Sequence, residues 1–294
     1  MRTLNRRGFT LIELLIALVI GAVVGAATAR VIRGTQRATQ AGMERVGLQQ
    51  TLRAGATYIT NILRELDAAD GDIGVANATQ LQFRSMRWAS PLCATPAAGA
   101  GSSVVLQIDP SSIYGIRTPD SVEDSILIFA DADASTRGDD TWLVGAVTAL
   151  GTGVCSNGSS STSLTVGITA GSGGQAAALG GNVTAGAPVR GFQMEELSFI
   201  QGVGGRWWVG QRTANRSGSW TAVQELVGPL ATGGFALSYF DSTGTATATL
   251  TDIASVGIIL RAESSNRVRT QASNIDFARD SLVTRVALRN NPRF

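Results

Sequence analysis

The chain has 294 residues, of which 44% are hydrophobic and only 16% are charged, and its formal net charge is +2. This composition is typical of a folded protein with one large domain or two small ones and excludes a disordered chain. Histidine and lysine are both absent. These absences exclude Ser-His-Asp, Cys-His and Ser-Lys catalysis and histidine-containing zinc or haem sites. We therefore expect no enzyme and no cofactor, and bulk charge supports no firm nucleic-acid prediction.

The N-terminus joins a short basic segment to an apolar one. Residues 1–8 contain three arginines and no acidic residue, and residues 9–29 are apolar except for Glu13 and two threonines. As a helix, the apolar segment is about 30 Å long, which matches the hydrocarbon core of a bilayer. A secretory signal cleaved after the Ala-Thr-Ala at 27–29 and an uncleaved anchor both fit this pattern. Neither accounts for Glu13, because an ionisable side chain in an apolar span is costly without a partner.

The stretch RRGFTLIELLIALVI, residues 6–20, resembles the class III signal of type IV pilins and of type II secretion pseudopilins. The resemblance implies that prepilin peptidase removes residues 1–8 as a leader by cutting after Gly8. Phe9 then becomes the N-methylated first residue. The glutamate of that family falls on Glu13, whose carboxylate would face the Phe9 amino group of a neighbouring subunit. Such a pair offsets the cost of a buried charge and sets the register of the filament.

Small residues repeat along the apolar segment at every fourth position, so they share one helix face. This face would let another helix approach closely, although simple composition bias explains it equally well. The residues of this stripe are Ala17, Gly21, Gly25 and Ala29.

The resemblance also implies a single pass through the inner membrane, with the N-terminus cytoplasmic and the head periplasmic.

The helical pattern continues beyond the apolar segment. We expect one long helix from Phe9 to about Asp70, which Gly71 would end. Residues 9–29 form its transmembrane or filament-core half. Residues 30–70 form its amphipathic half, with leucines and isoleucines at spacings near three, four and seven that would pack on a globular head.

Residues 71–294 are expected to form a β-rich periplasmic or extracellular head. Several stretches alternate between apolar and polar residues and are separated by turn signals, which is typical of half-buried antiparallel strands. The expected strands cover residues 80–85, 104–108, 125–130, 141–149, 164–168, 194–200, 206–212, 235–240, 255–263 and 282–289. The fold class is therefore α+β, with a long N-terminal helix packed on an antiparallel β-rich head.

The second half of the chain is similar to W-type minor pilins and to the J-type pseudopilin of type II secretion. The similarity lies in YFDSTG at 239–244, DIASVGIILRAES at 252–264 and VTRVALRN at 283–290. It implies a structural minor pilin or pseudopilin that joins major and minor pilins in a type IV pilus or related cell-surface filament, priming assembly at the tip. One alternative is a J-type pseudopilin of type II secretion. Another is a membrane-anchored extracellular binding module unrelated to filaments.

Two groups in the head are candidate structural or binding sites. Cys93 and Cys155 are the only cysteines, and outside the cytoplasm they are expected to form a disulfide rather than two free thiols. DADASTRGDD is a loop rich in carboxylates, which suit Ca²⁺, but its spacing does not fit an EF-hand and a solvated turn is the simpler interpretation. We assign no metal; the weak candidate ligands are Asp131, Asp133, Asp139 and Asp140.

A third group combines aromatic and basic residues, as surfaces that bind single-stranded nucleic acid or polysaccharide do. Its members are Arg206, Trp207, Trp208, Arg212, Arg216 and Trp220. Neighbouring residues on a strand point to opposite faces, so at most one of Trp207 and Trp208 is expected in the core. Internal packing of the group is the alternative to a ligand surface.

Overall fold

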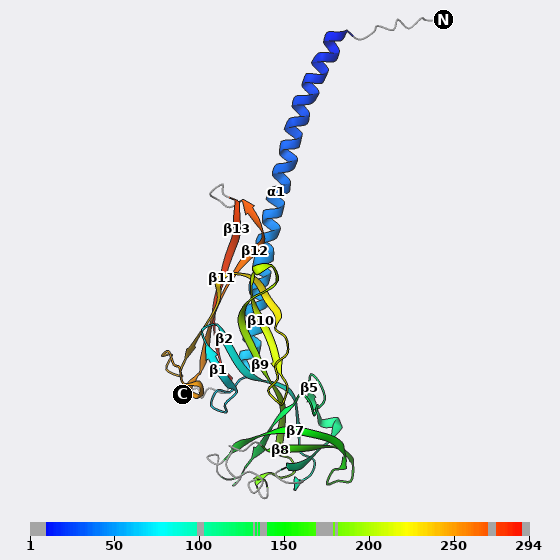
Figure 1. Ribbon diagram of the computed structural model, residues 1–294, viewed down its shortest axis with the longest axis vertical. Helices are drawn as coiled ribbons and strands as arrows, with labels where there is room; N and C mark the ends of the chain where they lie inside the picture. Colours follow the sequence, from blue (N-terminus) through cyan, green and yellow to red (C-terminus); the bar gives the residue numbers. More distant parts are fainter. Residues whose placement is uncertain are drawn as a thin grey trace, which may run out of the picture.

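The computed structural model describes residues 10–98, 103–131, 133, 135, 140–168, 179, 182–269 and 275–289. Over these residues a long N-terminal helix is followed by a large antiparallel β-sheet (Figure 1), which confirms the predicted α+β class. The helix and the first strands are α1 (Leu11–Arg64), β1 (Ile73–Asn77), β2 (Gln80–Pro91), β3 (Ala97–Ala98), β4 (Ser103–Ile108), β5 (Tyr114–Gly115), β6 (Ser125–Ala130) and β7 (Thr141–Val154). The remaining strands are β8 (Ser160–Ile168), β9 (Pro188–Gln201), β10 (Trp207–Ala214), β11 (Gln224–Phe240), β12 (Ser255–Arg269) and β13 (Ile275–Ala287). Short 3₁₀ turns are η1 (Pro110–Ser112), η2 (Val203–Gly205) and η3 (Leu250–Asp252).

Helix α1 ends at Arg64, before the predicted end near Asp70. Asp67 explains the difference, because its Oδ1 atom accepts hydrogen bonds from the backbone N–H groups of Ala69 and Asp70 at 3.0 and 3.3 Å. Such a side-chain turn competes with helical hydrogen bonding. Gly71, with a φ of 77°, therefore closes this turn rather than the helix.

The described strands form one continuous hydrogen-bonded sheet of antiparallel pairs. Its main order is β13–β12–β11–β10–β9–β6–β7–β8–β4–β3, and β2 adds to β9 outside this path and carries β1 and β5. The register of β2 on β9 runs from Gln80 opposite Ser198 to Pro91 opposite Pro188. This long pair therefore extends through both halves of the head.

The head has two apolar cores. The first, which we call the helix lobe, joins the second half of α1 to β1, β10–β13 and the adjoining parts of β2 and β9. Leu48, Leu52, Ile59 and Leu63 lie on one face of α1 at spacings of four and seven, and all are buried. Each such side chain contributes roughly 1.5–3 kcal/mol when buried. The amphipathic face predicted for this half of the helix is the face that meets the sheet.

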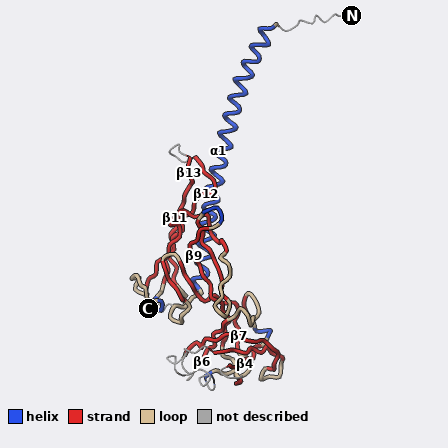
Figure 2. Tube along the Cα trace, viewed as in Figure 1, coloured by secondary structure: helices blue, strands red, loops and turns tan. Residues whose placement is uncertain are grey.

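The second core defines the distal lobe, which comprises the described residues between 87 and 192. It is built on β3–β8, the end of β2 and the start of β9, with Trp88, Leu106 and Val189 at its centre. Figures 1 and 2 show this lobe beyond the C-terminal end of α1, at the opposite end of the long axis from the N-terminus. The head thus reaches further along the axis than the helix does.

All ten predicted strand segments lie in or overlap observed strands, and most observed strands are longer. The prediction for β9 began at residue 194, whereas the strand begins at Pro188. Its first residues, including the buried Val189, belong to the distal core. The strands β1, β3 and β5 were not predicted. β3 and β5 have two residues each, which is too short for a periodic signal.

Candidate functional site

The first turn of α1 is held by a capping box between Thr10 and Glu13. The backbone N–H and the hydroxyl of Thr10 each donate to Glu13 Oε2 at 3.1 Å, and the Glu13 N–H donates to Thr10 Oγ1 at 3.3 Å. This arrangement satisfies backbone donors that a helix start leaves free, and it places a negative charge at the positive end of the helix dipole. Glu13 is exposed on the single chain, and the predicted cleavage residues Gly8 and Phe9 lie outside the described residues.

Among the described residues, the apolar half of α1 has no packing partner. Large hydrophobic side chains are exposed along its whole length, from Leu11 at 82% to Val31 at 66%. In the described part of the chain, α1 is the helix that is long and apolar enough to cross a membrane, with a mean hydropathy of 2.4 over its most apolar window. So much exposed apolar surface needs a lipid or a protein environment.

The stripe of small residues is open along this exposed half. Ala17, Gly21 and Gly25 are exposed, and Ala29 is half-buried. A Cβ atom added at Gly21 or Gly25 would meet no atom within 4 Å. The described part of the chain therefore leaves this face open to a second helix.

The prokaryotic N-terminal methylation motif matches residues 3–29, a range that contains Gly8, Phe9 and Glu13. No curated protein and no solved structure matches the chain. The motif supports a type IV pilin-like protein, and it implies processing by prepilin peptidase and assembly with other pilins. Together with the exposed apolar helix, it fits anchoring in the inner membrane followed by incorporation into a pilus.

Cys93 and Cys155 form the expected disulfide in the distal lobe, with their Cα atoms 5.1 Å apart. The bridge joins the segment after β2 to the turn between β7 and β8. The backbone reinforces this join, because the Ser156 N–H donates to the Cys93 carbonyl at 3.0 Å. Because disulfides persist in oxidising compartments, this bridge indicates that the head folds outside the reducing cytoplasm.

The acidic loop of the distal lobe is only partly described, and Asp139 lies outside the described residues. Asp133 accepts hydrogen bonds from the N–H and the hydroxyl of Ser135 at 3.0 and 2.8 Å, and the Asp131 N–H donates to the Asn182 carbonyl at 2.8 Å. Asp140 precedes β7 and is exposed. Among the residues described, these carboxylates do not gather into a group of three that would hold a metal ion.

The aromatic and basic residues in and around β10 pack within the fold and do not form a single surface. Trp207 stacks on Phe199 with ring centres 4.7 Å apart at the edge of the helix-lobe core, whereas Trp208 points to the opposite face. Arg206 donates to the carbonyls of Ser264 and Ser265, at 2.8 Å each. Internal packing is therefore the better interpretation of this group.

The other two arginines of the group also have partners inside the fold. Arg212 forms two hydrogen bonds with Glu196, at 2.9 and 2.8 Å, and lies over the Trp220 ring. Arg216 donates to the Ser121 carbonyl at 2.5 Å.

A partly buried polar network between α1 and the sheet, centred on the buried Glu195, was not predicted. The Tyr58 hydroxyl donates to Gln211 at 3.0 Å, Gln211 donates to Glu195, and Arg87 pairs with Glu195 at 3.1 Å. Arg87 also donates to Gln193 at 3.0 Å, close to the junction of the two lobes. Burial, together with the nearby Glu195 charge, raises the pKa of Tyr58. The network joins the helix to the start of the distal lobe.

On the opposite face of β9, Glu196 is also buried and fully paired. Besides Arg212, the amides of Gln80 and Gln82 donate to its Oε2 atom at 2.8 and 2.7 Å. Burial by itself would raise the pKa of Glu196, but the hydrogen bonds from Arg212, Gln82 and Gln80 outweigh it and lower the pKa below its usual value. The sequence shows two adjacent glutamates at 195 and 196. Their pairing with Arg87 and Arg212 could have been predicted only if the neighbouring strands had been known.

Proposed function

We propose that this chain is the precursor of a structural minor pilin or pseudopilin. Prepilin peptidase cuts it after Gly8, Phe9 is methylated, and the subunit enters a type IV pilus or related filament. The observation that carries the proposal is the methylation motif at residues 3–29 on a helix whose apolar half is uncovered. Residues 9–29 are the transmembrane and filament-core half, residues 30–70 join this half to the head, and residues 71–294 are the periplasmic or surface-exposed head.

Glu13 is assigned a role in assembly within this proposal. In the single chain its carboxylate caps its own helix through Thr10. Cutting after Gly8 brings a charged amino group to Phe9, one residue from that cap. In a filament, the same carboxylate would face the Phe9 amino group of a neighbouring subunit, and the stripe from Ala17 to Ala29 would let the helices approach. The capping box keeps the carboxylate hydrogen-bonded until that partner arrives.

The position of the distal lobe supports a place at the tip of the filament. Pilin helices pack in parallel, so the space beyond the C-terminal end of α1 is where the head of the next distal subunit would lie. Here that space holds the distal lobe of the same chain (Figure 1). A subunit with such a lobe is easily placed at the distal end, where no subunit follows. This position suits a subunit that primes assembly.

The first experiment is the intact mass and N-terminal sequence of the protein recovered from membranes. We expect a start at N-methyl-Phe9. A start at Arg30 would mean secretory cleavage after Ala29, and an intact Met1 would mean a plain anchor; either result would refute the proposal. A Gly8 variant that blocks the peptidase serves as the control and should retain the leader.

The second experiment separates a pilus subunit from a J-type pseudopilin. The gene is deleted, and surface pili and type II secretion are measured in the same strain. Loss of pili with normal secretion supports a minor pilin, and the reverse supports the J-type alternative. If both functions persist and the protein is absent from sheared filaments, the chain is a membrane-anchored binding module.

A further inference from the structure

Three arginines follow the apolar segment of α1 on its head side. Arg30, Arg33 and Arg37 are all exposed, and in the described part of the chain none of them forms an ion pair. No acidic residue occurs between positions 14 and 43, so no carboxylate lies within one turn of them on the helix. Their charges are therefore unmatched among the described residues.

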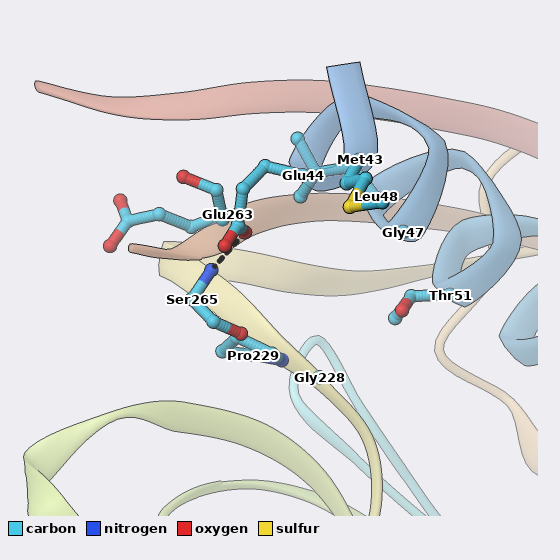
Figure 3. A pocket seen from close by; sticks show the side chains of 10 residues that line it. Met43, Glu44, Gly47, Leu48, Thr51, Gly228, Pro229, Glu263 and Ser265 are labelled. Atoms are coloured by element: carbon cyan, nitrogen blue, oxygen red, sulfur yellow. Dashed lines mark hydrogen bonds between the residues drawn. The ribbon is translucent and has the colours of Figure 1, made fainter. Parts of the chain in front are cut away.

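These arginines lie on the side of α1 that faces β12. At 3.6 residues per turn they share one face with Glu44, which is about two turns beyond Arg37. Glu44 accepts hydrogen bonds from the Ser265 N–H at 3.1 Å and from the Asn266 side-chain amide at 2.7 Å. Figure 3 shows Glu44 joined to Ser265 in this way, beside a hollow of about 280 Å³ between the helix and the sheet.

The β12–β13 hairpin brings another arginine close to this level. From Ser265 the strand continues alongside α1 toward the N-terminal half of the helix (Figure 1). Arg267, two residues further, lies about 7 Å beyond Ser265, which equals between four and five residues of helix. Arg267 is thus near the level of Thr39 and Gln40, less than one turn of α1 from Arg37. It is exposed, and it lies 5.4 Å from the centre of the Phe277 ring.

Exposed apolar residues lie at the start of β13 and in the turn between β9 and β10. Ile275, at the start of β13, is 72% exposed, and Val203, in the turn between β9 and β10, is 92% exposed. Arg206 places that turn at the level of β12, because it donates to the carbonyls of Ser264 and Ser265. Cationic and apolar side chains therefore gather where the head approaches the uncovered helix, as on surfaces that rest on a membrane.

The first two helix arginines fall within the headgroup layer of a bilayer, and the third falls at its outer edge. If the apolar segment to Ala29 fills the hydrocarbon core, Arg30 and Arg33 lie in the headgroup layer, which is roughly 5–8 Å thick on each side of the core. Arg37 begins about 10 Å from Arg30, just beyond this layer, and helical side chains lean toward the N-terminus, here toward the membrane. Guanidinium groups bind phosphate in a two-pronged geometry, so this depth suits phospholipid phosphates. Two carboxylates are held close to Arg267 by other hydrogen bonds: Asp276 accepts from the Phe277 N–H at 2.8 Å, and Glu44 accepts from Ser265 and Asn266.

We propose that the three helix arginines and Arg267, here called the arginine collar, bind anionic phospholipid headgroups on the periplasmic side of the membrane. The inference rests on the membrane insertion assigned under the proposed function. Binding would hold the head close to the bilayer and fix the tilt of α1 before the subunit is extracted into a filament. The partner is an anionic lipid surface, because the collar begins where the apolar segment ends.

The test measures lipid bound to the full chain. The protein, purified in mild detergent, is offered equal amounts of phosphatidylglycerol and phosphatidylcholine, and retained lipids are counted by native mass spectrometry. The test variant is R30Q/R33Q/R37Q. The matched control is R45Q/R53Q/R64Q, which removes three exposed arginines from the same helix further from the apolar segment. The Cys93–Cys155 bridge, checked by mass, reports that the head has folded.

We expect the wild type and the control to retain phosphatidylglycerol in preference to phosphatidylcholine. The collar variant should lose that preference, by about fivefold for each arginine removed at low salt. Retention of phosphatidylglycerol by the collar variant, or equal retention of both lipids by the wild type, would overturn the proposal. If the variant keeps its lipid but disappears from sheared filaments, the arginines bind a neighbouring subunit instead. Failure of the proposed function is visible separately, in the N-terminal mass and the filament fraction.

Discussion

Gly55 of α1 lies against Val227 of β11 so closely that a Cβ atom on Gly55 would come within 2.5 Å of the Val227 Cγ1 atom. Gly55 therefore sets how near the helix approaches the sheet, and Val227 is buried beneath it. A glycine in a helix interior is unfavourable by up to about 1 kcal/mol relative to alanine. At this position the close packing outweighs that preference.

We expect Gly55→Ala to destabilise the full chain by about 1–3 kcal/mol through overpacking, as measured by denaturant unfolding in detergent. The matched control is Gly42→Ala in the same helix, where an added Cβ meets nothing within 4 Å. That change should be neutral or stabilising by up to about 1 kcal/mol. The double variant Gly55→Ala/Val227→Ala should recover part of the loss. Equal effects of the two glycine changes would contradict this account.

The two roles assigned to Glu13, as a helix cap and as the partner of the Phe9 amino group, can be measured independently. Thr10→Ala removes the capping box and keeps the carboxylate, at a cost of roughly 0.5–2 kcal/mol to the start of the helix. Glu13→Ala removes both the cap and the proposed partner of Phe9. We expect Glu13→Ala to abolish recovery in sheared filaments and Thr10→Ala to reduce it only slightly, with both proteins still inserted in the membrane. Equal losses of filament recovery in the two variants would show that Glu13 acts only as a helix cap.

The Arg87–Glu195 pair should contribute far more to stability than the Arg279–Glu263 pair. Glu195 is 2% exposed in its ion pair with Arg87, whereas Arg279 is 62% exposed. Removing one partner of a buried pair leaves an uncompensated charge, so we expect Glu195→Ala to cost about 3–5 kcal/mol. Arg279→Ala should cost less than about 1 kcal/mol, because the Arg279 side chain is largely exposed to solvent. Chemical denaturation of both variants beside the wild type measures the difference.

The contributions of Asp72 and Glu196 to the free energy of unfolding should change in opposite directions with pH. Burial raises the pKa of Asp72 above its usual value, so the folded state binds its proton more tightly than the unfolded state does. Lowering the pH from neutral through that raised pKa should therefore stabilise the wild type relative to Asp72→Asn. The pKa of Glu196 is lowered, so its stabilising contribution is present above the usual carboxyl pKa and is lost as the pH falls through the lowered value.

Unfolding free energies of the wild type, Asp72→Asn and Glu196→Gln between pH 3 and pH 7 test these signs. Relative to Glu196→Gln, the wild type should lose stability as the pH falls. Relative to Asp72→Asn, it should gain stability. Parallel curves for the two comparisons would show that the two carboxyl groups do not have the environments described here.

Loss of the disulfide should loosen the distal lobe selectively. The bridge lies within that lobe and joins residues 62 positions apart. Replacing both cysteines by serine should cost about 4 kcal/mol in the chain-entropy picture. Hydrogen exchange is expected to accelerate in β4, β7 and β8 and to change little in β12. Uniform acceleration through both lobes would mean that the two cores unfold as one unit.

Local patterns in the sequence predicted the parts of the protein that depend on near neighbours in the chain. The signal around Gly8, Phe9 and Glu13 is contiguous, and the methylation motif covers it. The spacing of leucines and isoleucines between residues 48 and 63 predicted the buried face of α1, because a helix repeats every 3.6 residues. Alternation along the chain found all the long strands. Pairing of the two cysteines followed from their being the only two.

The tertiary structure alone decided which distant residues meet. Tyr58 and Gln211 are 153 positions apart, yet they are linked by a hydrogen bond, and nothing in either local sequence signals the other. The division into two lobes likewise depends on β2 and β9 passing through both cores. The early end of α1 reflects a side-chain hydrogen bond at Asp67 that competes with helical bonding. Because periodicity reports only which face of an element is buried, the sequence determined the elements and the N-terminal signal, and packing between distant strands determined the shape of the head.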